Sequence, residues 1–309
     1  MAEVFVCSNA AAAAAYQEVL AAGTENADLT AQVRPSSSGV TMNYCCLQGW
    51  FEDLSWGGDG NFAGPPGFAR DAGAVEVFGD FQEALAKTSA DAVYIATPHY
   101  LHAPLSIKAL EAGKHVLVEK PIATSLADAD AMLAKAQETG LKLFVAYSAQ
   151  VSDAMVRLRD WIAQGMLGKV TGLRIVYRAD KDPSYWHGGF TLRVHDEWRK
   201  YLDKAGGGPL IMNTVHDLNT MRYVTGLEAT RVYAEYDTFT TPGVEVEDYI
   251  TLIIRYENGA IGSLEAGCTL PGGDPRGAVN RIHGTKGQII FGRPSPTIYL
   301  RESWGEIPG

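Results

Sequence analysis

The sequence predicts an α/β domain with a doubly wound parallel sheet over residues 1–148, and then an α+β domain with a mostly antiparallel, open sheet over residues 149–309. Three observations predict this arrangement. The chain has 309 residues, more than one typical hydrophobic core organises. Short apolar runs alternate with helical patterns in the first half, as in parallel sheets. Long strand-like runs follow one another in the second half with few helices between them, which is typical of antiparallel sheets.

Composition and charge exclude several classes of protein. The hydrophobic fraction of 46% and the aromatic fraction of 10% are those of a well-packed globular protein. A net charge of −10 argues against nucleic acid or an anionic membrane surface as partner. No apolar run reaches the roughly 18 residues of a membrane span. The N-terminus lacks the pattern of a secretory signal, so we expect a cytoplasmic protein.

Four cysteines occur, at Cys7, Cys45, Cys46 and Cys268. Their spacing matches neither a zinc site nor a disulfide framework. We therefore expect reduced thiols and no bound metal.

The first residues predict the opening of a dinucleotide-binding βαβ unit of the Rossmann type. Glu3–Cys7 has the pattern of a strand, Ser8–Ala22 is an alanine-rich helix, and Asp28–Val33 is a second strand. The glycine fingerprint of such units is replaced by Ser-Asn-Ala-Ala-Ala-Ala at residues 8–13. The helix N-terminus can still offer N–H groups to phosphate, so Ser8, Asn9 and Ala10 are predicted cofactor contacts.

The residues after the second strand bear on cofactor choice. An acidic residue there would bind the ribose hydroxyls of NAD, whereas this chain has Arg34 and Ser36, which suit the 2′-phosphate of NADP. An ordinary polar turn is an equally good interpretation. Residues 39–69 show little periodicity, and a lid, an insertion or a drifted sequence would all explain them.

Regular patterns resume after residue 68. The predicted elements of this part, in order, are a strand at Val75–Phe78, a helix at Asp80–Lys87, a strand at Asp91–Ala96, a helix at Leu101–Ala112, a strand at His115–Val118, a helix at Ser125–Thr139 and a strand at Leu143–Tyr147. Ser125 is the expected N-cap of its helix, and Gly140 follows that helix's end.

The second domain begins with a predicted helix at residues 152–164. The predicted strands are Val170–Arg178, Ala229–Phe239, Tyr249–Tyr256, Ala260–Cys268 and a hairpin over Ile282–Phe291. Asn258-Gly259 is the signature of a tight hairpin turn. The chain ends at Gly309 soon after the last hairpin, which raises the alternative that this domain is truncated at its C-terminus.

Lys120 is the residue best placed for chemistry. It follows the buried strand His115–Val118, and ligands of open α/β sheets bind outside the carboxyl ends of the strands. A buried lysine is costly unless it is paired or functional. The alternative is an ordinary solvated Glu119-Lys120 pair in a loop.

Three motifs occur in order: Ala-Thr-Pro-His-Tyr-Leu-His at residues 96–102, Glu-Lys-Pro at 119–121, and Gly-Gly-Gly at 206–208 followed by His216-Asp217. In motifs and spacing the chain resembles the Gfo/Idh/MocA oxidoreductase family, named for glucose–fructose oxidoreductase and inositol dehydrogenase. The resemblance implies a Rossmann domain, a C-terminal sheet domain for substrate and assembly, and nicotinamide-dependent oxidoreduction of a sugar or polyol. It also implies cofactor contacts at Ala96, Thr97, Pro98, His102, Glu119 and Lys120.

Hydride transfer from a secondary alcohol needs a group that polarises the oxygen and a base that takes the proton. Lys120 is the predicted polarising group, because its ammonium stabilises developing negative charge. His216, on a predicted helix over Pro209–Thr225, is the predicted base. A purely structural histidine is the alternative. Inositol dehydrogenase-like members carry an Asp one helical turn before the His, where this chain has Met212, so an Asp–His dyad is not expected.

Polar and aromatic residues of the second half are predicted to contact substrate. They are Tyr147, Tyr185, Trp186, His187, Arg193, Asn213 and Asp217. Aromatic faces with Arg and His donors suit a sugar, and a loop packed against the sheet explains residues 183–198 equally well. Asp217 is also a residue that could orient the helix.

The leading hypothesis is an NAD(P)-dependent oxidoreductase acting on a sugar, glycoside or inositol-type polyol. A glycoside-cleaving enzyme that keeps NAD bound is the second. A non-catalytic relative that binds a sugar or a partner protein is the third, and the alanine-filled turn and Met212 favour it. An open sheet face often becomes a subunit interface, so we expect a homo-oligomer.

Overall fold

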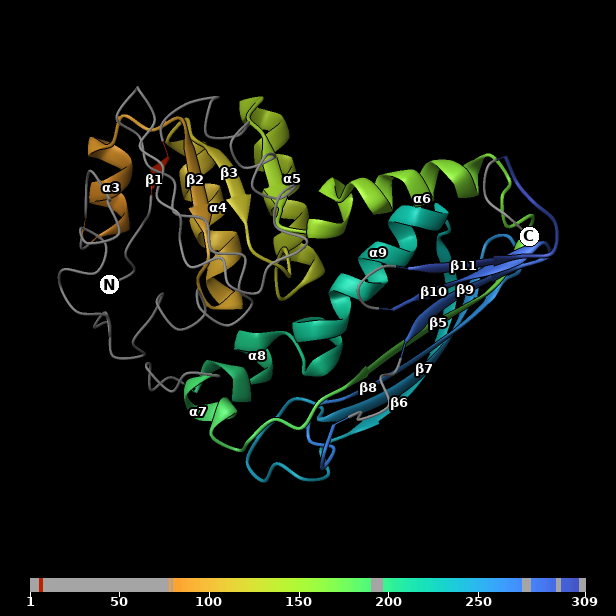
Figure 1. The fold of residues 1–309 in the computed structure, drawn as a ribbon. Coiled ribbons are helices and arrows are strands. Elements are labelled where there is room, and N and C mark those ends of the chain that lie inside the picture. The colour runs from red at the N-terminus through yellow and green to blue at the C-terminus, as the bar shows by residue number, and fades with distance from the viewer. Residues whose placement is uncertain are drawn as a thin grey trace. The chain divides into compact units, whose positions relative to one another are not determined.

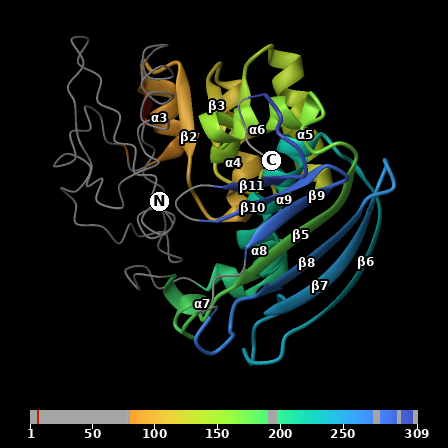
Figure 2. The same cartoon turned by 45° about the vertical axis from the view of Figure 1, so that its right-hand side comes forward.

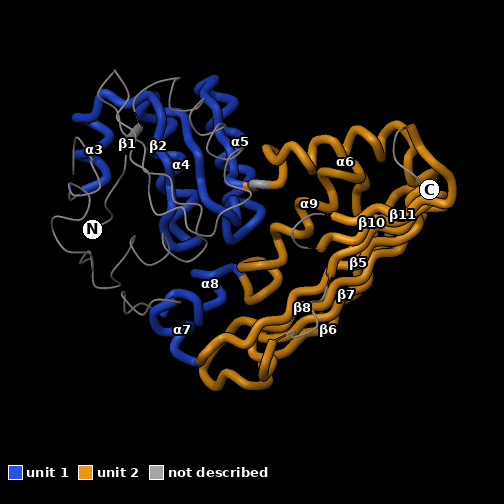
Figure 3. Tube along the Cα trace, in the orientation of Figure 1, with its two compact units in different colours: residues 1–146, 183–206 blue, residues 147–182, 207–309 orange. Residues whose placement is uncertain are grey.

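The computed structural model describes residues 6–7, 78, 80–189, 197–273, 279–292 and 296–305. The chain divides into two compact units, residues 1–146 with 183–206 and residues 147–182 with 207–309 (Figure 3). The main segment of the first unit ends at residue 146, two residues before the domain boundary predicted at residue 148. Residues 183–206, predicted to belong to the second domain, pack with the first unit in the structure.

The first unit is built on a four-stranded sheet in the order β1-β2-β3-β4 (Figure 1). β2 (Ala92–Ile95), β3 (His115–Val118) and β4 (Leu143–Val145) are parallel neighbours. This confirms the Rossmann-type parallel sheet. Val6–Cys7, the described residues of the strand expected at Glu3–Cys7, form β1, which pairs antiparallel with β2 instead of parallel to its neighbours. The predicted elements at 8–22, 28–33 and 75–77 lie outside the described residues.

Two helices of this unit, α3 and α5, begin at a side chain that caps them. Asp80 accepts a hydrogen bond from Glu83 N at the start of α3 (Phe81–Lys87), and Ser125 accepts one from Asp128 N at the start of α5 (Leu126–Thr139). Gly140 ends α5 in the left-handed conformation. The 3₁₀ turn η1 (His99–Leu101) leads into α4 (His102–Glu111).

The core of the first unit lies between its sheet and helices. Alternate residues of β2 and β3 are buried, as expected for a strand with one face on helices. The buried hydrophobic side chains are those of Phe81, Ala84, Leu85, Val93, Ile95, Ala103, Ala109, Leu110, Val116, Val118, Ala123 and Met132. The segment after residue 183 adds three short helices, α7 (Tyr185–Gly188), η3 (Trp198–Lys200) and α8 (Leu202–Ala205), of which α8 contacts η1.

The second unit is built on a seven-stranded sheet in the order β11-β10-β9-β5-β8-β7-β6 (Figure 2). Its strands are β5 (Val170–Arg178), β6 (Ala229–Asp237), β7 (Tyr249–Tyr256), β8 (Ile261–Gly267), β9 (Asn280–Gly284), β10 (Gly287–Phe291) and β11 (Thr297–Leu300). Only the β5–β8 pair is parallel among these described strands, which confirms the mostly antiparallel sheet. β11 was not predicted.

Helices cover one face of this sheet (Figure 1). They are α6 (Asp153–Ala163), preceded by the 3₁₀ turn η2 (Ser148–Val151), and α9 (Val215–Thr225), preceded by the π-helical turn η4 (Leu210–Thr214). Leu158, Met221 and Ile254 belong to the buried core between the helices and the sheet. The predicted helix at Pro209–Thr225 is therefore confirmed in extent but begins with a π-helical turn.

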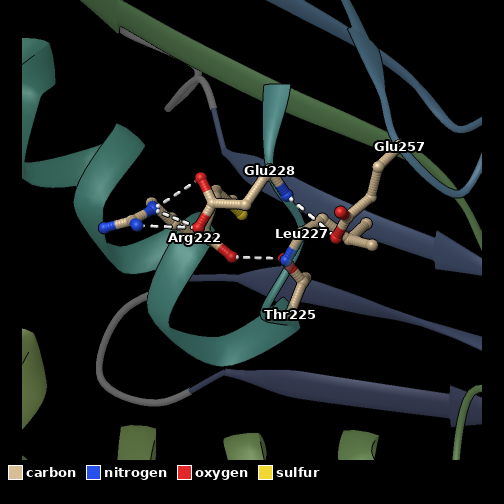
Figure 4. A network of polar contacts seen from close by, with 6 residues as sticks. Arg222, Thr225, Leu227, Glu228 and Glu257 are labelled. Atoms are coloured by element: carbon tan, nitrogen blue, oxygen red, sulfur yellow. Dashed lines mark hydrogen bonds and ion pairs between the residues drawn. The ribbon is translucent and has the colours of Figure 1, made fainter. Parts of the chain in front are cut away.

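A polar network fixes the passage from α9 to β6 (Figure 4). Gly226 ends α9 in the left-handed conformation, and the Arg222 guanidinium donates to both carboxylate oxygens of Glu228 at 2.8 and 3.0 Å. Leu227 N donates to Thr225 Oγ1 at 3.3 Å, and Glu228 N donates to Glu257 Oε1 at 3.4 Å. The first residues of β6 are thereby held beside the turn that ends β7.

Candidate functional site

Two chain segments leave the parallel sheet side by side. Ile95 and Val118 are partners at the ends of β2 and β3, and Glu119 N donates to Ile95 O at 2.8 Å. Residues 96–98 and 119–121 therefore emerge at the same carboxyl edge. This is the edge at which ligands of open α/β sheets bind.

Lys120 lies buried at this edge. Only 5% of its surface is exposed, so the solvated-loop interpretation of the Glu119-Lys120 pair is wrong. Tyr94 on β2 donates its hydroxyl hydrogen to Glu119 Oε1, and Lys120 N donates to Glu119 Oε2 at 3.2 Å. Glu119 thus joins β2 to the segment that carries Lys120. Tyr94 was not predicted as a site residue, because in the sequence it has the pattern of an ordinary strand residue.

His102, for which the family resemblance implies a cofactor contact, has its side chain enclosed by the protein. Its side chain has no exposed surface, and its ring nitrogens lie 2.6 Å from Pro121 O and 2.9 Å from Thr97 O. The ring is therefore enclosed between the two strand-end segments. His102 is the first residue of α4.

Thr97 has a different environment. Its Oγ1 atom is buried and makes no hydrogen bond with any residue that the structure describes. A buried hydroxyl of this kind calls for an explanation, and a bound group is one. Ser8, Asn9, Ala10, Arg34 and Ser36, the other predicted cofactor residues, lie outside the described part of the chain, as does the Cys45-Cys46 pair.

The glycines before η4 allow a close approach of two backbone segments. A Cβ atom on Gly208 would lie 1.8 Å from Glu247 O, and Gly207 has a φ of +145°. The Glu247 carboxylate accepts hydrogen bonds from Gly208 N at 2.6 Å and Leu210 N at 3.2 Å. Burial raises the pKa of Glu247 from its ordinary value. These contacts fix the start of the helix that carries His216.

Asn213 and His216 face different neighbours within the second unit. Lys181 donates from Nζ to Asn213 Oδ1 at 2.8 Å, and Lys181 is only 5% exposed. The rings of Tyr147 and His216 meet edge to face, with their centroids 6.0 Å apart. Lys181 was missed, because Asp180-Lys181-Asp182 reads as a solvated turn.

Asp217, predicted to contact substrate, is hydrogen-bonded to a residue of the sheet. Asn280 on β9 donates to Asp217 Oδ1 at 2.6 Å and accepts from Val176 N on β5 at 2.9 Å. Burial raises the pKa of Asp217 to about 6. The side chain anchors α9 to the sheet, the helix-orienting role that was weighed as its alternative.

The aromatic segment after residue 183 packs within the first unit. Tyr185 and Trp186 are buried, at 4% and 2% exposure, which leaves them little surface for a sugar. Arg199 stacks over the rings of Tyr185 and Trp198 at 5.2 and 4.5 Å. His187 is exposed and pairs with Glu197, Nδ1 to Oε1, at 2.7 Å. Arg193 and His195 lie outside the described residues.

The described residues contain neither a metal-binding cluster nor a membrane-spanning helix. Among them, no three His, Cys, Asp or Glu side chains gather in a way that could hold a metal ion. No described helix combines the length and apolarity needed to cross a membrane.

Burial raises the pKa of Cys268 to about 11, so this thiol is not a reactive nucleophile.

Two family models match the chain. The model described as an oxidoreductase family with an NAD-binding Rossmann fold matches residues 66–147, and the model of the GFO/IDH/MocA C-terminal domain matches residues 155–290. The second match begins just after the first compact unit's main segment ends. Together the matches include the strand ends around Lys120 and the helix of His216.

Named relatives and a solved structure agree with these matches. The 1,5-anhydro-D-fructose reductase of Ensifer adhaerens is 31% identical over 244 residues, which cover 77% of this chain and 69% of the relative. The scyllo-inositol 2-dehydrogenase (NAD(+)) of Bacillus subtilis is 32% identical over 228 residues, 72% of this chain and 61% of the relative. A levoglucosan dehydrogenase solved in complex with NADH and levoglucosan has a TM-score of 0.65 and 28% identity, covering 78% of this chain and 65% of that one.

The chain thus spans between 61% and 69% of the length of these three proteins. The parallel sheet with Lys120 at its edge, the second, mostly antiparallel sheet and both family matches lead to one conclusion. This chain belongs to the Gfo/Idh/MocA family of oxidoreductases.

Proposed function

We propose that the chain is an NAD(P)-dependent oxidoreductase that transfers a hydride between nicotinamide and a hydroxyl-bearing carbon of a sugar, glycoside or inositol-type polyol. The observation that carries this proposal is the buried Lys120 at the carboxyl edge of β3 in a segment matched by the NAD-binding family model. Relatives named for sugar and inositol oxidoreduction support the substrate class.

Residues of the strand ends would hold the cofactor. The hydroxyl of Thr97 is buried and available to a bound group, and Ala96 and Pro98 flank it on the same segment. These residues fit a nicotinamide cofactor, which supplies or accepts the hydride when it is bound. NADH is present in the related levoglucosan dehydrogenase structure. A preference for NADP, which Arg34 and Ser36 favour, is part of the proposal.

Each catalytic side chain has a separate task. The Lys120 ammonium donates a hydrogen bond to the reacting oxygen and stabilises its negative charge. His216 takes the proton that the alcohol loses, since an imidazole titrates near neutral pH. Asn213, held by Lys181, offers an amide for a substrate hydroxyl. Tyr147, at the edge of the His216 ring, and the exposed His187 are further proposed substrate contacts.

A screen of cofactor reduction tests this function. The purified chain is incubated with NAD⁺ or NADP⁺ and a panel of sugars, glycosides and inositols, and reduced nicotinamide is followed by absorbance. Stoichiometric NADH or NADPH release is the expected result. Glycoside cleavage without net reduction would favour the enzyme that retains NAD. Absence of nicotinamide binding in calorimetry would favour a non-catalytic relative.

We further propose that two copies associate through the uncovered face of the second sheet. Tyr233, Ile253 and Ile261 expose their side chains on neighbouring strands of this face. Ile253 sits on β7, within the sheet rather than at its edge, and is 47% exposed. An apolar patch on an open sheet is a common site of association between identical chains. A cytoplasmic location, expected from the sequence, completes this proposal.

Replacing Ile253 with glutamate should weaken this association at least about tenfold, because a carboxylate at an apolar interface loses the burial energy of the isoleucine and adds a desolvation cost. Sedimentation velocity over a range of protein concentrations measures the strength of the association. Leu126→Glu is the control, since Leu126 is 85% exposed on α5 in the other unit. Equal association of the wild type and Ile253→Glu would contradict the proposed interface.

A further inference from the structure

His102 makes two contacts that one neutral imidazole cannot both satisfy. Nδ1 lies 2.6 Å from Pro121 O, and Nε2 lies 2.9 Å from Thr97 O. A carbonyl oxygen only accepts, so each contact requires an N–H group on the ring. A neutral imidazole has one N–H, and the imidazolium has two. The ring has no exposed surface, so water does not complete either contact.

We propose that His102 is a positioning residue, held as a doubly donating imidazolium, which joins the segment after β2 to the segment after β3 and so sets the place of Lys120. This role rests on the proposed function, because it takes Lys120 as the catalytic group. His102 itself touches neither substrate nor cofactor.

The position of the His102 ring beside the ends of β2 and β3 explains how it would fix the place of Lys120. The hydrogen bond from Glu119 N to Ile95 O continues the β2–β3 ladder one step past the strands. His102 then connects the two segments further out, at Thr97 and Pro121, which directly follows Lys120. The ring thus holds one residue on each segment. Lys120 lies between Glu119, which is hydrogen-bonded to Ile95, and Pro121, which is hydrogen-bonded to His102.

The surroundings of the ring are compatible with a positive charge. His99 packs against it with ring centroids 5.6 Å apart, and its own Nδ1 lies 2.8 Å from Ala205 O. Hydrogen bonds to two carbonyl dipoles stabilise the charged form of a buried group, and a catalytic group displaced by about 1 Å can lose about a hundredfold in rate.

Nuclear magnetic resonance of the histidine rings tests the protonation state directly. The full chain is labelled with ¹⁵N-histidine, and the His102 signals are identified by their loss in His102→Gln. Both His102 nitrogens should carry protons at mildly alkaline pH, where exposed histidines are neutral. One protonated and one bare nitrogen would overturn the imidazolium. This measurement needs no catalytic turnover, so it stands or fails independently of the proposed function.

Kinetics of His102→Gln test the positioning role. The glutamine amide donates from one nitrogen and cannot reach both carbonyls, so Lys120 should lose its fixed place. We expect kcat to fall about a hundredfold while the Kd for NADH, measured by calorimetry, changes only a few-fold. His115→Gln is the matched control, because His115 lies at the other end of β3, where its Nδ1 accepts from Lys142 N at 3.0 Å. An unchanged kcat in His102→Gln would refute the role.

Discussion

Replacing Lys120 with alanine is expected to lower kcat about a thousandfold. The ammonium is buried at the carboxyl edge of the parallel sheet, where the low dielectric strengthens its effect on a developing negative charge. Loss of one such donor costs about 10²–10³ in rate. Steady-state measurement with the best substrate of the reduction screen, at saturating cofactor, gives the effect.

A second variant separates loss of charge from loss of geometry. Lys120→Arg keeps a positive charge but replaces a compact ammonium with a planar fork, so it should restore little activity. Lys108→Ala is the control, because Lys108 is exposed on α4 of the same unit. NADH binding, followed by calorimetry, should persist in all three variants. Full activity in Lys120→Ala would remove Lys120 from the mechanism.

Replacing Asp217 with asparagine is expected to stabilise the folded chain at neutral pH. Burial raises the pKa of Asp217 from its ordinary 3.8 to about 6, so the folded state holds the proton more tightly than the unfolded state does. Stability contributed by this group is therefore complete below about pH 4 and is lost as the pH rises through 6. The shift corresponds to about 3 kcal/mol.

The Asp217→Asn substitution removes the loss of stability at neutral pH but keeps the hydrogen bond to Asn280. Its amide oxygen can still accept the hydrogen bond from Asn280, which is 2.6 Å in the wild type. The free energy of unfolding, measured in urea at about pH 4 and about pH 7.5, should differ little between the two proteins at the lower pH. At the higher pH the variant should be more stable by up to about 3 kcal/mol.

Asp130→Asn provides the control, because Asp130 is exposed on α5. Its effect on the free energy of unfolding gives the baseline for replacing an exposed carboxylate. An Asp217→Asn variant that is less stable than the wild type at about pH 7.5 but not at about pH 4 would show that the ionised carboxylate stabilises the fold. The anchoring of α9 would then depend on charge rather than on the hydrogen bond alone.

The helices and strands of the described region follow from signals close together in the sequence. Ser125, Asp128 and Gly140 mark both ends of α5 as predicted, since capping depends only on residues three or four apart. β5 and β7 occupy the ranges predicted from their alternation. Shorter elements such as α7, α8 and β11 carry too few residues for a periodic signal, and they were not predicted.

Some residues of the candidate site could be predicted from the sequence, and others could not. Lys120 could be singled out because a strand end is visible in the sequence. Lys181 could not, because its partner Asn213 lies 32 residues further along the chain. Tyr185 and Trp186 were predicted to contact sugar from their composition, yet burial within the first unit decides their role.

The sequence by itself determined the order of elements, the family, and the strand end that carries Lys120, because each depends on local pattern or on motif order. Only the tertiary structure decided which side chains are enclosed. His102 lies between carbonyls of Thr97 and Pro121, and Asp217 turns to Asn280 on a strand 63 residues away. Burial and hydrogen-bond partners arise from contacts between distant segments, so the glutamate–lysine pair at 119–120 changed from a plausible surface pair to a buried site only in the folded chain.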